Sequence, residues 1–305
     1  MIYQMAVGAR SEQGFPNRPI RLITPEGGGS LELVARLIAQ GISGSLGQPV
    51  IVENHEVDIG IELVAKAPPD GHTLLLHGPP FWTGPLMQDK PYDPLTDFSP
   101  VTLATTSPLI VSVHPSLAAN SLKELIALAI AKPGTLRYGS GITGTSSHLG
   151  AELFKSMAGV DIVRVPYTGG GLAMPDLIAG RLHLMFTSAG SGMPYVKSGR
   201  VRALAVASAE PSALAPGLPT VAATLPGYEA AQIIGIFAPA TTPLPVIQRL
   251  NEEIVRFLKT AETKDRLLDA GLEAVGSAPQ ELAVKVKSEM ARLSKVIKDA
   301  GIRVE

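Results

Sequence analysis

The sequence predicts an α/β fold built from two successive sets of strands and helices. Short aliphatic or β-branched runs alternate with amphipathic stretches along most of the 305 residues, which is the pattern of parallel strands joined by covering helices. The 31 glycines and 26 prolines punctuate this alternation with turns. A chain of this length is sufficient for two ordinary domains with sizeable hydrophobic cores.

The first set lies near the N-terminus. Residues 19–24 predict a strand, and a glycine-rich run at 27–30 follows it. Residues 31–43 have the apolar periodicity of an amphipathic helix, and Ser30 is a suitable N-cap for it. The rest of this set is expected at 50–52 (strand), 59–67 (helix) and 73–77 (strand).

The second set occupies the middle of the chain. It begins with a strand at 109–113 and a helix at 121–131, which Ser121 caps with Glu124 at the capping-box position. The further elements are expected as strands at 162–165, 182–186, 203–207 and 232–238, and as helices at 147–157, 172–179, 193–198, 244–259 and 279–299. We therefore expect one lobe made of residues 16–110 and 236–305, and a second lobe made of residues 111–235.

Composition argues against several classes of function. Lys and Arg number 26 against 27 Asp and Glu, with no basic run, which disfavours a nucleic-acid-binding surface. The absence of cysteine excludes disulfides, thiolate metal sites and cysteine nucleophiles. No stretch reaches 18 uninterrupted apolar residues, so we expect no transmembrane helix. The first ten residues lack the features of an intact secretory signal and are compatible with a tag, a shortened chain or a cytosolic N-terminus.

Two glycine-rich turns, each leading from a strand into a helix, are the first candidates for a ligand site. Glycines let a ligand approach the backbone, and a helix N-terminus offers unpaired N–H groups. Neither turn has the spacing of a phosphate-binding loop or of GxGxxG. For the first turn, a tight turn without a ligand is an equally good interpretation. The candidate residues are Gly28, Gly29 and Ser30 in the first turn, and Thr145, Ser146 and Ser147 in the second.

An enzymatic interpretation of the second turn makes Ser146 or Ser147 a nucleophile and His148 its base. The GxSxG elbow of serine hydrolases is absent, and adjacent side chains at a helix start point in different directions. His148 and Glu152 have the i, i+4 spacing of metal ligands, but without HExxH we expect a packing pair.

Residues after the third strand are further candidates. His77 stands at the carboxyl end of a predicted parallel strand, where open α/β sheets place ligands. Phe81 and Trp82 could line a pocket or pack between domains, and we favour packing.

Several longer segments carry a family resemblance. They are LGQPVIVEN (46–54), ELVAKAPPDG (62–71), PYDPLTDF (91–98), HLGAELF (148–154), VPYTG (165–169) and GRVRALAV (199–206). Together, over about residues 16–302, they resemble the substrate-binding receptors of tripartite tricarboxylate transporters, the Bug family of periplasmic solute-binding proteins.

The resemblance implies an α/β, two-lobed type II periplasmic-binding-protein-like fold with its ligand cleft between the lobes. It implies a monomeric periplasmic receptor for a small organic solute with at least one carboxylate, which works with the membrane transporter subunits of the tripartite system. No catalytic residue, cofactor or metal is implied. The alternative is a hydrolase or other enzyme evolved on the binding-protein scaffold, which would need a nucleophile, a base and an orienting group.

The expected ligand contacts come from both lobes. In the first lobe they are Gly28, Gly29, Ser30, Asp58, His77 and Gly78, and in the second lobe they are Thr145, Ser146, Ser147, Gly169, Gly170, Thr187 and Ser188.

The chain departs from the family pattern at the rim of the first lobe. Glu26, Glu56 and Asp58 stand where the family usually has glycines, an Arg and an Asn, and Thr187 replaces a usual Asp. Ionised acids supply only hydrogen-bond acceptors. We therefore expect a ligand with at least one neutral or cationic end, unless these acids face solvent.

Overall fold

The structure is a computed structural model that describes residues 14–25 and 29–303. The strands in this part of the chain are β1 (Ile20–Pro25), β2 (Val50–His55), β3 (Thr73–His77), β4 (Phe98–Val113), β5 (Arg137–Ser140), β6 (Val163–Pro166), β7 (Leu184–Ser188), β8 (Arg202–Val206), β9 (Ala231–Pro239) and β10 (Glu273–Ala274). The α-helices are α1 (Gly29–Leu46), α2 (Val57–Ala65), α3 (Pro80–Thr83), α4 (Leu122–Ala131), α5 (Ser146–Ala158), α6 (Met174–Ile178), α7 (Ala189–Lys197), α8 (Leu244–Leu258), α9 (Ala261–Asp269) and α10 (Pro279–Asp299). Short 3₁₀ turns are η1 (Gly84–Leu86), η2 (Gly170–Ala173) and η3 (Val221–Ala223).

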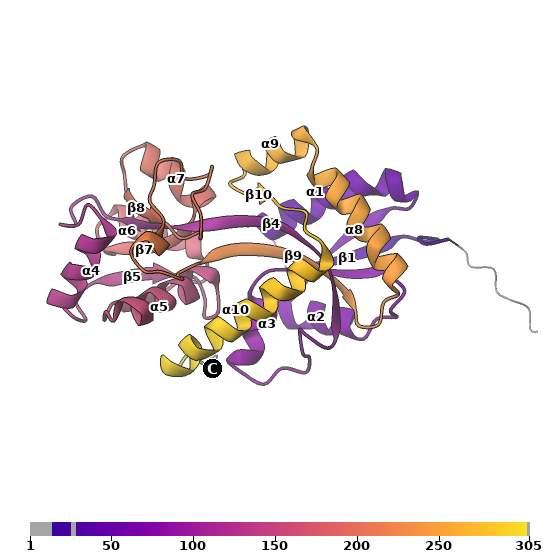
Figure 1. Cartoon of the computed structure of the whole chain (residues 1–305), viewed down its shortest axis with the longest axis horizontal. Coiled ribbons are helices and arrows are strands. Elements are labelled where there is room, and N and C mark those ends of the chain that lie inside the picture. The colour runs from indigo at the N-terminus through magenta and orange to yellow at the C-terminus, as the bar shows by residue number, and fades with distance from the viewer. Residues whose placement is uncertain (1–13, 26–28, 304–305) are drawn as a thin grey trace, which may run out of the picture.

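Two long strands connect the halves of the molecule. The main path of the sheet runs β2-β1-β3-β9-β4-β7-β5-β6, and β8 and β10 also pair with β4. β1 pairs in parallel with β2 and β3, and β5 pairs in parallel with β6 and β7, whereas β4 and β9 are antiparallel to their neighbours. β4 and β9 run across the middle of the molecule in Figure 1. Each half therefore has its own parallel strands, and the crossing strands join the halves.

The hydrophobic residues form a separate core in each half. One core packs Ile20 and Leu22 of β1 against Ile38 of α1 and Leu250 of α8. The other includes Leu125 of α4, together with aromatic and aliphatic residues of α5, β7 and β8. The residue boundaries that we predict for two lobes remain a prediction, and Leu109 and Val296, which those boundaries assign to the first lobe, pack in the second core.

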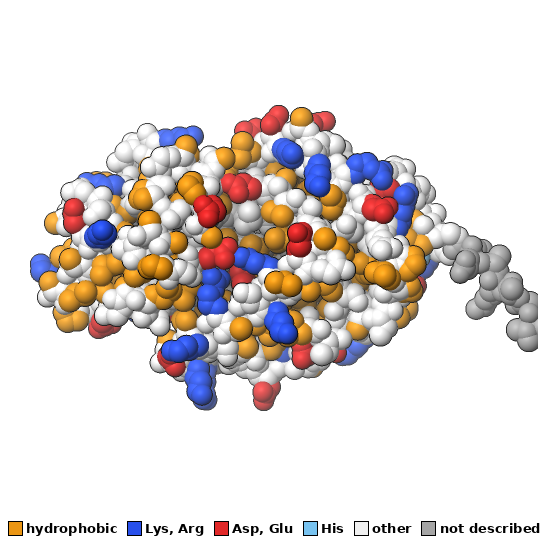
Figure 2. All heavy atoms as spheres, viewed as in Figure 1, with side chains coloured by type: hydrophobic (Ala, Val, Ile, Leu, Met, Phe, Trp, Pro, Cys, Tyr) orange, Lys and Arg blue, Asp and Glu red, His pale blue; other side chains and the backbone are white. Residues whose placement is uncertain are grey.

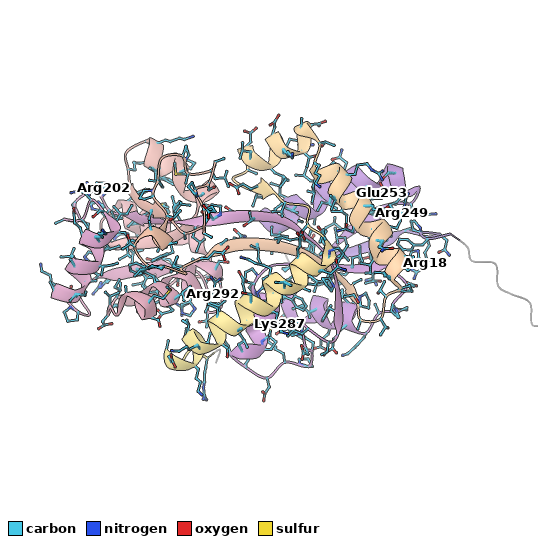
Figure 3. The ribbon with its side chains drawn as sticks, viewed as in Figure 1. Arg18, Arg202, Arg249, Glu253, Lys287 and Arg292 are labelled. Atoms are coloured by element: carbon cyan, nitrogen blue, oxygen red, sulfur yellow. The ribbon has the colours of Figure 1, made fainter. Side chains whose placement is uncertain are left out.

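Helix α10 crosses from one half to the other (Figure 1). Its Glu289 accepts a hydrogen bond of 2.9 Å from Trp82 Nε1, and its Leu293 and Ile297 pack with Leu149 of α5. Figure 2 shows acidic and basic side chains close together in the middle of the face that α10 crosses. Arg292, labelled in Figure 3, belongs to this group and lies 3.8 Å from Glu229, which precedes β9. α10 thus contacts both halves beside the crossing strands.

The expected α/β class is confirmed, but several local predictions need correction. Ser30 is not an N-cap, because α1 already includes Gly29. The strand expected at 109–113 begins at Phe98, because Pro100, Pro108 and the intervening threonines hide the β pattern. Helix α9 was not expected. Ser121 does cap α4 by accepting from the Glu124 N–H, although the Glu124 carboxylate reaches the Asn120 N–H instead of that of Ser121.

Helix α5 is anchored to β5 by a buried carboxylate. Tyr138 Oη donates to Glu152 Oε1, and Lys155 Nζ lies 2.9 Å from the same oxygen. Burial, and then the negative charge of Glu152, raise the pKa of Tyr138, which keeps its hydroxyl protonated and able to donate. The first turn of α5 starts six residues before Glu152, so this contact helps to position the end of the helix that faces the other half.

We expect Tyr138→Phe to lower the free energy of unfolding by roughly 1.5–3 kcal/mol. The substitution removes a hydrogen bond to the charged, buried carboxylate of Glu152, and hydrogen bonds to charged groups are the stronger ones. Urea denaturation measures this change. Tyr195→Phe is the control, because the Tyr195 hydroxyl has no hydrogen-bond partner among the described residues, while its ring stacks with Arg200. Equal stabilities of wild type and Tyr138→Phe would contradict the anchoring role.

Candidate functional site

A cavity of about 420 Å³ lies where the two halves face each other. It is bounded by the starts of α1, α5 and α7, by the turn after β3, and by the crossing strands β4 and β9. The residues that line it are Ser30, Leu31, Gly78, Pro79, Pro80, Leu109, Thr145, Ser146, Ser147, Gly171, Phe186, Thr187, Ser188, Ser191 and Gln232. The carboxyl ends of parallel strands and the amino ends of the helices that follow them meet here, which is where open α/β sheets bind ligands.

The structure brings most of the predicted contact residues to this cavity. Those that line it are Ser30, Gly78, Thr145, Ser146, Ser147, Thr187 and Ser188. Asp58, His77 and Gly169 are not among the lining residues, although Gly171 of the 3₁₀ turn that follows Gly169 is. The contacts expected of Gly29 and Gly170 stay predictions. Gly28, like Glu26, lies outside the described residues. Their roles in binding remain predictions, and the geometry gives its support to the first group.

Two of the acidic residues at the first-lobe rim, Glu56 and Asp58, are not among the residues that line the cavity. Asp58 forms an ion pair with Lys90, whose Nζ lies 2.7 Å from Oδ2 and 2.8 Å from Oδ1. Glu56 is exposed at the start of α2. The expectation of a ligand with a neutral or cationic end rested on these acids facing the ligand, so the argument for it is removed as far as Glu56 and Asp58 are concerned.

Two buried histidines stand beside the cavity without lining it. His77 is 2% exposed, and its Nδ1 lies 2.9 Å from the Gly78 nitrogen, which fixes the backbone of a lining residue. Burial lowers the pKa of His77 to about 4. His148 is also 2% exposed and accepts from the Gly144 N–H. Burial, followed by the nearby positive charges of Arg164 and Lys155, lowers the pKa of His148 to about 3. Both imidazoles are therefore neutral at pH 7.

None of the described lining residues carries an ionisable side chain. What the site offers is the amino ends of helices. Neither α5 nor α7 has a side chain that caps its first N–H groups, and Thr145 and Ser188 at the N-cap positions make no capping bond. Unpaired N–H groups and the positive end of the helix dipole favour an anion. The arrangement suits a carboxylate bound by backbone donors.

Arg164 supports the glycine-rich turn before α5 from behind. Its guanidinium donates to Ser140 Oγ (2.8 Å), to the Gly141 carbonyl (2.9 Å) and to Thr143 Oγ1 (3.1 Å). Arg164 does not line the cavity. It fixes the path of the turn and adds positive potential near the start of α5 without contributing a charged group to the cavity wall.

Two hydroxyls of this turn, those of Thr145 and Ser147, form hydrogen bonds within the turn itself. Thr145 Oγ1 donates to the Ile142 carbonyl (2.8 Å), and Ser147 Oγ accepts from the Gly141 N–H (3.1 Å). Ser147 Oγ also lies 3.2 Å from Thr145 Oγ1. Because the Thr145 proton is engaged with Ile142, Ser147 is the donor in that pair. Neither hydroxyl has a proton left for a ligand, whereas Ser146 Oγ has no partner among the described residues.

Two further hydroxyls, those of Ser30 and Ser191, have a proton available to donate to a ligand. Gln232 Nε2 donates to Ser30 Oγ (3.1 Å), and Ser188 Oγ donates to Ser191 Oγ (2.9 Å). A hydroxyl oxygen that accepts a hydrogen bond keeps its own proton to donate. Ser30 and Ser191 can therefore donate to a bound anion from opposite sides of the cavity.

Sequence reasoning missed Gln232, Ser191 and the apolar wall formed by Leu109 and Phe186. A signal existed for Gln232, which is the one polar side chain in an otherwise apolar and glycine-containing strand, AQIIGIFAP. A signal existed also for Ser191, which lies one helical turn after Ser188. Phe81 and Trp82, in contrast, are fully buried in an aromatic cluster with Phe98 and Phe237, as the packing interpretation predicts.

The serine–histidine pair of the hydrolase interpretation does not form among the described residues. The described contacts of Ser147 are with Gly141 and Thr145, and His148 Nδ1 bonds the Gly144 N–H, so no serine–histidine hydrogen bond forms. Glu152 is engaged by Tyr138 and Lys155. The part of the chain that the structure describes contains no group of three His, Asp or Glu side chains placed to hold a metal ion, and none of its helices is long and apolar enough to cross a membrane.

Two α/β halves around a cavity lined by helix amino ends define a solute-binding protein of the periplasmic type. Residues 34–302 match the tripartite tricarboxylate transporter family receptor. BugT of Bordetella pertussis is 32% identical over 303 residues, which cover 97% of this chain and 93% of BugT. The chain belongs to this receptor family, which confirms the resemblance seen in the sequence.

Two solved structures are similar over nearly the whole chain. Rpa4515 of R. palustris, solved with adipate, is 36% identical, with a TM-score of 0.79 over 95% of this chain and 99% of that one. MatC of Rhodopseudomonas palustris, solved with bound malate, is 30% identical, with a TM-score of 0.76 over 93% of this chain and 100% of that one. The two-lobed fold that the sequence predicts is therefore confirmed.

The lowered pKa values of His77 and His148 predict how the stability of the protein depends on pH. Their pKa values in the folded state lie below the value of about 6.5 for an unfolded chain, so the unfolded state binds protons first as the pH falls. The free energy of unfolding that the two neutral histidines contribute is present in full above pH 6.5. It is lost at about 1.4 kcal/mol per pH unit for each histidine between pH 6.5 and about 4.

Urea denaturation at pH 7.5, 5.5 and 4.5 measures this loss. We expect His148→Gln to be less stable than wild type at pH 7.5 and to show a shallower decline toward pH 4.5. Parallel pH profiles of wild type and His148→Gln would show that His148 titrates in the folded protein as it does in the unfolded chain.

Proposed function

We propose that this protein is a periplasmic receptor that captures a small organic acid in the cavity between its halves and delivers it to the membrane subunits of a tripartite transporter. The observation that carries the proposal is the uncapped amino end of α5, which points at a cavity without ionisable side chains in its described lining. Backbone N–H groups and neutral hydroxyls bind a carboxylate well and offer no acid to pair with an ammonium group.

The proposed ligand class is a short aliphatic acid with one or two carboxylates. Amino ends of helices from both halves border the cavity, so a dicarboxylate can be bound at both ends. Leu31, Leu109 and Phe186 supply apolar surface for the carbon chain between them. The adipate and malate found in the related structures belong to this class. We further propose that the receptor acts as a monomer whose halves, with the boundaries predicted above, close on the ligand.

Calorimetric titration with adipate and with malate tests the proposed ligand class, with the uncharged diamide of adipic acid as the control. A carboxylate should bind more tightly than a neutral amide, because hydrogen bonds to a charged group contribute about 1.5–3 kcal/mol each. We expect at least one of the two acids to bind and the diamide to bind at least about tenfold more weakly. Diamide binding as tight as that of the acid would contradict recognition by anion-binding donors.

The hydroxyls of the second turn give a sharper prediction. We expect Ser146→Ala to weaken binding of the acid by about tenfold or more, because its hydroxyl is free to donate. Ser147→Ala is the matched control, since its proton is engaged with Thr145. It should lower thermal stability and change affinity little. A larger loss of affinity for Ser147→Ala than for Ser146→Ala would overturn the assignment of donors.

A further inference from the structure

The two halves also touch at a point outside the cavity, through two glycines. Gly190 lies in the first turn of α7, and Gly271 lies between α9 and β10. A Cβ atom added to Gly271 would lie 2.0 Å from Gly190 Cα, and one added to Gly190 would lie 2.5 Å from Gly271 Cα and 3.0 Å from the Ala270 carbonyl oxygen. All three atoms belong to the backbone, so no side chain can rotate away to make room.

The two glycines belong to different cores. Ala189, next to Gly190, packs with Ile110 and Val206 on one side, whereas Leu272, next to Gly271, packs in the core of α1 and α8 on the other. Figure 1 shows α7 and α9 facing each other from the two halves. A hydrogen bond joins the same two regions, with Ser212 Oγ donating to Glu273 Oε1 of β10 at 2.6 Å. The contact therefore spans the halves.

The contact is directly coupled to the cavity. Ser188 and Ser191, which flank Gly190 in the chain, both line it. Gly190 and the two serines lie together at the start of α7. Any separation of Gly190 from Gly271 would therefore also move Ser188 and Ser191 away from the start of α1.

Resting on the function proposed above, we propose that Gly190 and Gly271 form the contact that closes the cleft, and that affinity for the ligand depends on neither residue having a side chain. Local structure alone favours other residues at Gly190, because alanine is the better residue inside a helix. Gly271 has a φ of +74°, which accounts for a glycine there but not for the opposite backbone being so close that an added Cβ would lie 2.0 Å from Gly190 Cα. Any Cβ at either position holds the halves apart and reduces the fraction of closed protein, and apparent affinity falls by the same factor.

The affinity experiment uses one variant from each half and a matched control for each. Gly190→Ala is compared with Gly44→Ala, also within a helix, where a Cβ meets nothing within 4 Å. Gly271→Asn is compared with Gly47→Asn, where φ is +69° and the space is also open. Asparagine tolerates positive φ better than other residues with a side chain. We expect both contact variants to bind adipate or malate at least about tenfold more weakly than their controls, while Gly190→Ala melts no lower than wild type.

A second readout needs no ligand. The chain has no native cysteine, so Ser212→Cys with Glu273→Cys places one thiol in each half for a short bifunctional maleimide. Because the crosslink is irreversible, it accumulates even from brief closures. We expect crosslinking of the free protein to be at least about tenfold slower with Gly190→Ala or Gly271→Asn than with the control substitutions.

The two readouts separate this inference from the proposed function. If neither acid binds the wild-type protein, the proposed ligand class is wrong, and crosslinking still decides the role of the glycine contact. Crosslinking as fast in the contact variants as in their controls would overturn the closing contact, whatever the acids do. So would equal slowing in the controls, because the effect would then belong to any substitution of a glycine.

Discussion

The constraint on which the rest of the structure depends is the geometry of the crossing strands β4 and β9. A parallel strand followed by a helix leaves unpaired N–H groups at the helix start, beside the carboxyl end of the strand. In one half this gives a single edge with positive potential. β4 and β9 extend through both halves, so the edge that carries α1 faces the edge that carries α5 and α7. Two facing sets of helix amino ends are thus a consequence of topology, and the described cavity wall between them consists of neutral residues.

The sequence predicts the parts of this arrangement that depend on local chemistry. Glycine-rich runs before amphipathic segments located the starts of α1 and α5, and period and capping located most helices. These signals are local, because they reflect backbone freedom and the pairing of N–H groups within a few residues. The same reasoning predicts that Ser30, Ser146 and Thr187 share one site, because the carboxyl ends of parallel strands lie at the same edge of a sheet, and all three line the cavity.

Other parts depend on contacts between residues far apart in the chain, which residue type alone does not predict. Asp58 could face a ligand or form an ion pair, and what decides is Lys90, 32 residues away. The roles of Thr145 and Ser147 as structural groups follow from the direction of their protons, which only the positions of the Ile142 and Gly141 backbone groups determine. The long strand β4 was underestimated because its prolines oppose β structure locally, whereas its pairing with β9 on one side and β7 on the other stabilises it.

A site whose described lining residues carry no charged side chain depends strongly on closure of the two halves. An arginine can bind a carboxylate strongly from one side through two parallel hydrogen bonds. Helix N–H groups and hydroxyls are individually weaker donors, and they lose strength when water competes for the same oxygen. Ser30 accepts a hydrogen bond from Gln232, and Ser191 accepts one from Ser188, on opposite sides of the cavity, so under the proposed closure one ligand would contact both when the halves come together. The free energy of binding would then be divided between these contacts and the cost of bringing the halves together, and the proposed limit to closing is the close backbone contact of Gly190 with Gly271. Under this proposal, residues that never touch the ligand influence affinity through the closing of the halves.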